Sequence, residues 1–212
     1  MPLYADLYLD HIDISKYLPA EICKSSCGLT SCKEWFQILK ERKNQGKIDR
    51  QILVDFNDYA LETVLSLDSI IPPIPITQHP ISGSLGLHEI NQPTPESPVL
   101  VTGNALATQE VVLAILATTI APFYLLFVDC RGHTVDMAMV YKTFTAEKVL
   151  EGIEATKLAS LVAHREIILP GITAPLQPDI EKKTGWKVRV GPYCAGELPL
   201  FFKKIWKRPP SA

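Results

Sequence analysis

The chain has 212 residues, of which 47% are hydrophobic and 21% are charged, and its formal net charge is -2. This length fits one large domain or two smaller ones, and the composition is that of an ordinary globular protein. A charge near zero, without a basic face, argues against nucleic acid as a partner, and the opening MPLYADLYLDH lacks the basic start and long apolar run of a signal peptide, so we expect a cytoplasmic protein.

Three cysteines lie close together near the start of the chain, at Cys23, Cys27 and Cys32. The chain has five cysteines in all, and an odd number with three bunched together favours a metal site over a disulfide framework. The residues SCKE fit a helix-capping box, which would put Cys32 at the positive end of a helix, where a thiolate is stabilised. Residues 1–70 are therefore predicted to form a small, mostly helical metal-binding domain.

A proline-rich segment follows at residues 71–97, IPPIPITQHPISGSLGLHEINQPTPES. Its prolines break helices and remove donors from a sheet, so the segment is predicted to be a linker or a long ordered connection. We expect neither a helix nor a central strand there.

Residues 98–212 alternate between strand and helix patterns, which is typical of an α/β domain. The predicted fold is a Rossmann-like, mostly parallel sheet with flanking helices. Strands are expected at VLVT, YLLFVD, TVDMAMV, EIILP and KVRVG, and helices at about 107–120, 145–155, 177–184 and 196–207. Thr145 is expected to cap the second of these helices.

An uncharged run of eighteen residues, Val111 to Val128, is just long enough to suggest a membrane span. Pro122 interrupts it, and the pattern changes from helix to buried strand there. We therefore predict protein core and no membrane segment.

Glycine-containing loops follow four of the predicted strands: VTGN, DCRGH, PGITAP and GPYCAG. In open α/β sheets, ligands bind beyond the carboxyl ends of the strands, and glycines there allow close backbone approach. None of the loops matches a dinucleotide fingerprint or a P-loop, which disfavours a nucleotide. These features predict a ligand-binding domain without identifying the ligand.

Several longer motifs identify a family. PTPESPVLVTGN, LLFVDCRGHTVDMAMV, ILPGITAPLQPDIEKKTGWKVRVGP and AGELPLFFKK resemble the cobalamin-binding domain of the corrinoid iron-sulfur protein, the large (gamma) subunit of CO dehydrogenase/acetyl-CoA synthase. A related domain occurs in the mercury-methylation corrinoid protein. The stretch IDISKYLPAEICKSSCGLTSC resembles the four-iron cluster domain of the same large subunit. The barrel domain that lies between these two domains in the family has no counterpart in this chain.

The resemblance implies a cobalamin bound base-off between the strand-end loops, with cobalt carrying a methyl group and a 4Fe-4S cluster re-reducing the cobalt. It implies methyltransferase or corrinoid-reducing protein partners and leaves open whether a hetero-oligomer forms. In the family, one residue faces the lower side of cobalt, and the matching position here is Met137. The residues implied to line the corrinoid are Thr102, Gly103, Asn104, Gly132, His133, Thr134, Met137, Gly171, Ala174, Pro175, Gly191 and Pro192.

Other interpretations of individual residues stay open. His133 is also explained as a loop hydrogen-bonder, Met137 as a core residue, and Asp129 as a cap for neighbouring amides. Cys130 and Cys194 are expected to be small buried residues.

The family's cluster motif has a fourth cysteine, and the matching position here is Asp49. The resemblance thus implies a cluster held by Cys23, Cys27, Cys32 and Asp49. A three-cysteine site with an exchangeable iron, a zinc site completed by a carboxylate or histidine, and a motif that binds nothing are the alternatives.

The leading functional prediction is a compact corrinoid/iron-sulfur protein that carries methyl groups between partner proteins or supports corrinoid reduction in one-carbon metabolism. The alternatives are a non-catalytic cobalamin or metal-binding module, such as an assembly factor, and a simple iron-sulfur electron carrier.

Overall fold

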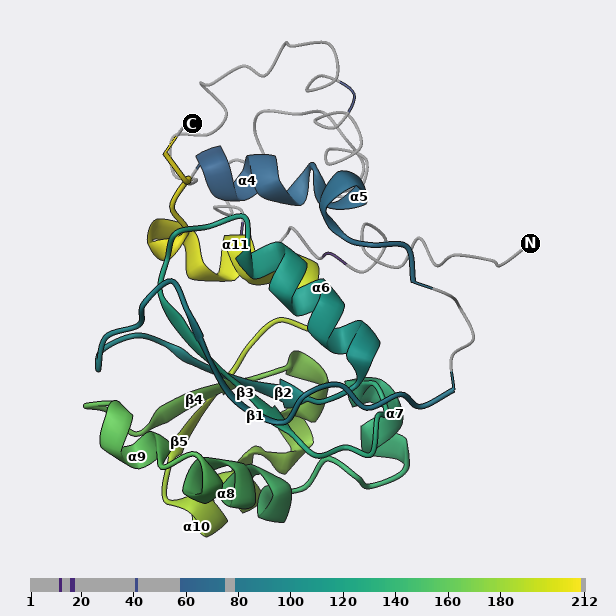
Figure 1. Ribbon diagram of the computed structural model, residues 1–212, viewed down its shortest axis with the longest axis vertical. Helices are drawn as coiled ribbons and strands as arrows, with labels where there is room; N and C mark the ends of the chain where they lie inside the picture. The colour runs from purple at the N-terminus through teal and green to yellow at the C-terminus, as the bar shows by residue number, and fades with distance from the viewer. Residues whose placement is uncertain (1–11, 13–15, 18–40, 42–57, 75–78, 211–212) are drawn as a thin grey trace.

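The structure is a computed structural model that describes residues 12, 16–17, 41, 58–74 and 79–210 (Figure 1). The strands are β1 (Gly86–Ile90), β2 (Val99–Gly103), β3 (Phe123–Val128), β4 (Glu166–Leu169) and β5 (Lys187–Val190). The α-helices are α4 (Asp58–Val64), α5 (Leu67–Ile70), α6 (Leu106–Leu116), α7 (Val135–Val140), α8 (Ala146–Ala155), α9 (Leu158–Leu161), α10 (Gln177–Thr184) and α11 (Leu198–Phe202). Short 3-10 helices are η3 (Gly171–Leu176), η4 (Ala195–Glu197) and η5 (Lys203–Ile205).

The described strands form one sheet in the order β1-β3-β2-β4-β5. All neighbouring pairs are parallel except β1 with β3, which are antiparallel. The sheet with its flanking helices confirms the predicted Rossmann-like α/β fold. All residues of β2 and β3 are buried, as expected for central strands that are covered by helices on both faces.

Helices cover both faces of the sheet (Figure 1). One face packs Leu100, Phe123 and Leu125 against apolar side chains of α4, α5, α6 and α11. The other face packs Val101 and Leu126 against side chains of α8, α9 and α10 and against Ala138 of α7. The alternation of successive strand residues between two apolar cores is the period-two pattern of a fully covered sheet.

The predicted strand at TVDMAMV is wrong, because these residues form helix α7. Apolar residues at Val135, Met137 and Met139 imitate strand alternation in the sequence. The structure instead buries Ala138 fully and Val135 and Met139 partly, which is the i, i+3, i+4 spacing of one helix face. Met137 is consequently left 39% exposed.

The proline-rich segment contains a strand that the sequence analysis did not predict. Strand β1 lies at the edge of the sheet beside β3. Residues 79–85, here called the strap, precede it and run across the carboxyl end of β2. An isolated bridge joins Ser82 to Ala105, and the amide of Gly83 donates to the carbonyl of Asn104 at 2.7 Å.

Helices α4 and α5 lie in the predicted first domain but share the hydrophobic core of the sheet. Leu61, Val64 and Leu67 belong to the same buried cluster as Phe123 and Trp206. The division of the chain at residue 70 stays a prediction.

The uncharged run from Val111 to Val128 divides, as predicted, into helix α6 and strand β3. Within the described ranges, no helix is long and apolar enough to cross a bilayer.

Candidate functional site

The sheet order itself creates a crevice at the carboxyl ends of the strands. The chain passes from β2 to β3 on one side and returns to β4 on the other side of β2. The loops that follow β2 and β4 therefore leave the sheet in different directions, and ligands bind at this type of switch point in open α/β sheets.

A cavity of about 560 Å³ opens at this switch point. Its walls come from the ends of β2 and β4, from helix α6 and from the loop after β5. The lining includes Leu100, Thr102, Thr108, Val111, Thr134, Asp136, Leu169, Pro170, Ile172, Pro192, Tyr193, Cys194 and Leu198. Most of the lining side chains are apolar. A few hydroxyls, the carboxylate of Asp136 and the ammonium of Lys16 also line the cavity, which is the usual make-up of a site for an organic ligand.

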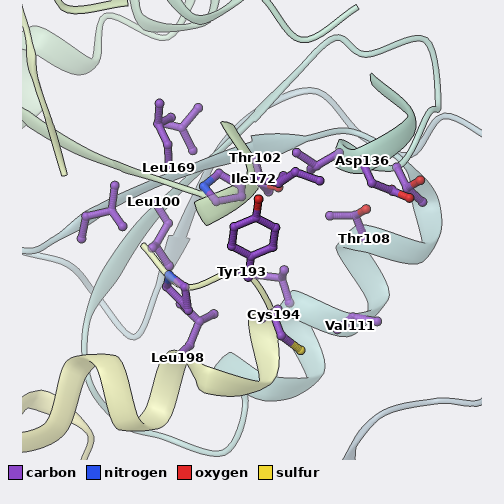
Figure 2. A pocket seen from close by; sticks show the side chains of 18 of the residues that line it. Leu100, Thr102, Thr108, Val111, Asp136, Leu169, Ile172, Tyr193, Cys194 and Leu198 are labelled. Carbon is purple, nitrogen blue, oxygen red and sulfur yellow. The ribbon is translucent and has the colours of Figure 1, made fainter. Parts of the chain in front are cut away.

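Tyr193 occupies the middle of this cavity, which is the larger of two adjoining cavities. Figure 2 shows its ring there, with the hydroxyl directed toward the side where Thr102 and Ile172 lie. The residue is 66% exposed although it lines a cavity. An exposed aromatic ring in an apolar cavity offers a flat surface on which a planar ligand can stack.

A second cavity of about 210 Å³ adjoins the first, since Ala107 and Thr134 line both. Its other walls are the strap, the start of α6, the loop after β3 and helix α7. They include His79, Pro80, Ile81, Leu106, Gly132, His133, Met137 and Tyr141. Four apolar side chains of this lining are exposed: Ile81 by 53%, Leu106 by 39%, Met137 by 39% and Tyr141 by 58%.

The loop after β3 is held by hydrogen bonds to its backbone. The side-chain oxygen of the buried Asn104 accepts from the amide of Cys130 at 2.8 Å, and Asp129 accepts from the amide of Arg131 at 2.9 Å. The carbonyl of Cys130 accepts from the amide of His133 at 3.1 Å, and ring atom Nδ1 of His133 lies 3.0 Å from the same oxygen. Asp129 thus accepts from an amide of its own loop, and His133 makes hydrogen bonds within the same loop.

Two of the predicted loop glycines lie in close contact with other parts of the chain, at the loop after β3. A Cβ on Gly132 would lie 2.6 Å from the carbonyl carbon of Ile81 in the strap. Gly132 also has a φ of +73°. A Cβ on Gly103 would lie 3.1 Å from Sγ of Cys130.

The same is true of the two glycines at the ends of β4 and β5. A Cβ on Gly171 would lie 2.9 Å from the backbone nitrogen of Tyr193, and one on Gly191 would lie 2.9 Å from the carbonyl oxygen of Leu169. All four glycines thus permit close packing of the walls, which is a sufficient reason for glycine at Gly132, Gly171 and Gly191.

The predicted site residues divide into three groups. Thr102, Thr134 and Pro192 line the larger cavity. Gly132, His133, Thr134 and Met137 line the smaller one. The rest, Gly103, Asn104, Gly171, Ala174, Pro175 and Gly191, are absent from the lining of both cavities.

The sequence analysis missed four lining residues with functional side chains: Lys16, Thr108, Asp136 and Tyr193. Tyr193 lies inside the predicted loop GPYCAG, where an aromatic residue between two glycines was a usable signal. Asp136 was not singled out, because its segment was predicted to be a strand, whereas it lies in helix α7 on the wall of the larger cavity.

The predicted cluster ligands Cys23, Cys27, Cys32 and Asp49 lie outside the described residues. Within the described residues, no three histidine, cysteine or acidic side chains group as metal ligands do. Burial raises the pKa of Cys130 to about 12 and that of Cys194 to about 11. Both are therefore thiols at neutral pH and poor metal ligands as they stand.

Comparison with protein families and with characterised proteins gives consistent matches. Residues 48–202 match a family model described as the CO dehydrogenase/acetyl-CoA synthase delta subunit. The acetyl-CoA decarbonylase/synthase complex subunit gamma of Archaeoglobus fulgidus is 39% identical over 127 residues, which are 60% of this chain and 27% of the relative. The subunit gamma of Methanosarcina acetivorans is 34% identical over 160 residues, 74% of this chain and 34% of the relative. The chain thus spans about a quarter to a third of the length of these curated relatives.

Proposed function

Because this chain belongs to the CO dehydrogenase/acetyl-CoA synthase delta subunit family, we propose that it is a corrinoid/iron-sulfur protein that carries a methyl group on cobalt in one-carbon metabolism. Residues 98–212 would bind the corrinoid, and residues 1–70 would hold the cluster. The relatives are named as subunits of a multi-subunit complex, which supports a hetero-oligomer with methyltransferase or corrinoid-reducing partners.

The observation that carries the proposal is the pair of joined cavities at the carboxyl ends of the strands. A base-off corrinoid has two parts, a broad macrocycle around cobalt and a nucleotide tail whose base is detached from the metal. A cavity of about 560 Å³ is in the range that encloses a drug-sized group. It suits the detached tail and is too small for a whole cobalamin.

The lining of the larger cavity fits such a tail. Its apolar walls, which include Leu100 and Val111, would contact the planar base, and the ring of Tyr193 would stack on that base. The hydroxyls of Thr102 and Thr108 are the neutral polar groups that would meet the sugar and phosphate.

The smaller cavity would lie under the macrocycle. Its exposed apolar side chains, such as Ile81 and Tyr141, offer a surface that a ligand of mixed polarity would cover. When bound, the corrinoid supplies the methyl-transfer chemistry at its cobalt, while the protein fixes its position and excludes water. Cys23, Cys27, Cys32 and Asp49 remain the proposed ligands of the 4Fe-4S cluster.

The first test is cofactor retention by the full chain. Protein purified without oxygen is mixed with hydroxocobalamin and reduced, excess cofactor is removed, and cobalt and iron per chain are measured with the visible spectrum. We expect near-stoichiometric cobalt with a base-off spectrum, and iron in the proportion of a four-iron cluster. No retained cobalt would overturn the proposal.

A matched pair of variants tests the assignment of the larger cavity to the tail. Thr108 and Glu110 both lie in α6, and Thr108 lines the cavity whereas Glu110 is exposed and absent from its lining. Thr108→Trp should lower cobalt retention more than tenfold, and Glu110→Trp should leave it unchanged. Equal retention by both variants would contradict the tail site.

Transfer of the methyl group separates the carrier from a non-catalytic cobalamin-binding module. The loaded protein is methylated at cobalt and offered a thiol or a second cobalt(I) corrinoid as acceptor. Loss of the methylcobalt spectrum with formation of the methylated acceptor supports the carrier, and retention of the methyl group with each acceptor supports the binding module.

A further inference from the structure

The loop after β3 presents an imidazole with a defined proton position. Nδ1 of His133 lies 3.0 Å from the carbonyl oxygen of Cys130. A carbonyl oxygen only accepts hydrogen bonds, so Nδ1 carries the proton and, in the neutral ring, Nε2 carries the lone pair. Metal-binding histidines almost always donate one ring N–H to a carboxylate, a backbone carbonyl or water, while the other nitrogen binds the metal.

The ring of His133 is also held in place from other directions. Its centroid lies 4.9 Å from that of Tyr141, with an angle of 31° between the planes. The backbone before it turns sharply through Arg131 and Gly132, both with positive φ. Asn104 anchors the start of this turn at the amide of Cys130. The imidazole is thus oriented by the protein's own contacts, as a preorganised ligand must be.

The surroundings of His133 suit the underside of a flat macrocycle. The ring lines the smaller cavity, whose volume of about 210 Å³ is too small to enclose a corrin. A corrin would have to lie across the mouth, where Ile81, Leu106, Met137 and Tyr141 expose apolar surface. His133 would then be below the plane of the ring.

Met137 lines the same cavity, so its thioether sulfur competes with the imidazole of His133 for this position. The thioether of Met137 is a soft and weak ligand, whereas a neutral imidazole is the commonest protein ligand of transition metals. Met137 is also 39% exposed in α7, and no contact of the described residues orients its sulfur in the way that Cys130 orients His133.

We infer that His133 is the lower axial ligand of the corrinoid cobalt, bound through Nε2, and that Met137 forms part of the surrounding wall. This inference rests on the proposed function, because it requires a bound corrinoid. It departs from the family pattern, in which the residue matched by Met137 faces the cobalt.

The test is electron paramagnetic resonance of the full chain loaded with cobalt(II) cobalamin of natural isotope content. The protein is prepared with 15N-labelled histidine. A coordinated protein histidine splits each cobalt line into a doublet, the cofactor's own base gives a triplet, and an unligated lower face gives no nitrogen splitting. We expect the doublet.

Three variants assign the doublet to one side chain. His133→Ala should remove it, and added unlabelled imidazole should restore a triplet in that variant. His79→Ala removes the other histidine of the same cavity, and Met137→Leu removes the competing thioether; both should keep the doublet. Circular dichroism and retained cobalt establish that each variant is folded and loaded.

Each result decides the matter. A doublet that persists in His133→Ala, or disappears in His79→Ala alone, overturns the assignment to His133. Retained cobalt with a triplet or without nitrogen splitting overturns this inference and leaves the proposed function standing. Failure to retain cobalt overturns both.

Discussion

The glycines in the strand-end loops can be explained in two ways, by close approach of a ligand or by close packing of the chain itself. Gly103, Gly132, Gly171 and Gly191 match a corrinoid-binding pattern. An added Cβ would clash with this chain's own backbone at Gly132, Gly171 and Gly191, and it would be in tight contact with Cys130 at Gly103. A ligand and a packed wall impose the same requirement on the backbone. Their contribution to the site is to bring the walls together.

Gly132→Ala measures the approach of the strap to the loop after β3. The variant would force alanine into a left-handed conformation and place its Cβ 2.6 Å from the backbone of Ile81. We expect the free energy of unfolding to fall by roughly 2–5 kcal/mol, from backbone strain and overpacking together. Urea denaturation measures this change.

Gly185→Ala is the matched control. Gly185 has a φ of +71°, close to that of Gly132, but nothing lies within 4 Å of its added Cβ. Only the backbone cost applies, so the loss should be about 1 kcal/mol. Equal losses in the two variants would contradict the close contact of the strap with Gly132.

Asn104 tests the hydrogen bond that fixes the loop carrying His133. Asn104→Ala would leave the buried amide of Cys130 without the acceptor that now lies 2.8 Å away. The free energy of unfolding should fall by about 1–3 kcal/mol, because the amide stays desolvated. Thr143→Val is the comparison, since Oγ1 of Thr143 is buried without a hydrogen-bond partner in the structure. That variant should be as stable as the wild type or slightly more stable, and a similar loss in both would contradict the role of Asn104.

Among the secondary-structure elements, helix α8 was predicted correctly from the sequence, whereas helix α7 was predicted to be a strand. Thr145 was predicted to cap α8, and its hydroxyl accepts from the amide of Lys148 at 3.3 Å. Helix α7 is only six residues long, too short for its period to be distinguished from that of a strand. A helix cap depends on residues next to each other in the sequence, whereas the burial of one helix face depends on the elements that pack against it.

An ion pair between α8 and α10 gives a prediction about pH. Lys183 donates to the carboxylate of Glu147 and, with a backbone amide and Thr145, lowers the pKa of Glu147 to about 2 from an ordinary value of 4.5. Because the folded pKa is the lower one, the contribution to stability is complete above pH 4.5 and is lost as the pH falls toward 2.

Lys183→Met should therefore raise the pKa of Glu147 toward its ordinary range, measured by carbon NMR of the labelled carboxyl. Lys182→Met, on the same helix, should leave it unchanged. Both groups of the pair are exposed, so high salt should also weaken the effect. A pKa of Glu147 that is the same in both variants would contradict the pairing.

At the scale of the whole molecule, the two ends of the described chain meet on one face of the sheet. Helices α4 and α11 pack against each other and, with α6, cover this face (Figure 1). Trp206, near the end of the described residues, is buried. The centroid of its ring lies 6.2 Å from that of Phe123 in β3. Helices α4 and α5 are thus part of the same core as α6 and α11, whose side chains Val111 and Leu198 line the larger cavity.

Leu61→Ala tests this shared core. Leu61 lies in α4, is 1% exposed and belongs to the cluster that contains Phe123 and Trp206. Its truncation should lower the free energy of unfolding by about 2–5 kcal/mol. The loss should appear in one transition of the whole sheet, followed by tryptophan fluorescence and by circular dichroism together. Leu85→Ala, at a position 57% exposed, should stay within about 0.5 kcal/mol of the wild type. A separate early transition that leaves the sheet folded would contradict the shared core.

The amino-acid sequence was enough to predict the α/β class, the strands β2, β3, β4 and β5, the capped helix α8 and the family. Those features are recorded in contiguous residues: buried runs of branched and aromatic side chains, a threonine before a helix, and motifs in a fixed order. The family model and the relatives confirm the family, and the domain composition, the cluster ligands and the corrinoid contacts stay predictions.

The positions of the cavities and the loop residues that line them follow from the packed fold. The strap meets Gly132 across about fifty positions of sequence, and Tyr193 enters the larger cavity beside Thr102 from the far end of the sheet. Strand order places these residues together, and it is fixed by the burial of both sheet faces at once, a property of the packed whole that no single segment contains. For the same reason, no single segment predicts that His133 and Met137 line one cavity. They do so because the residues after His133 form helix α7.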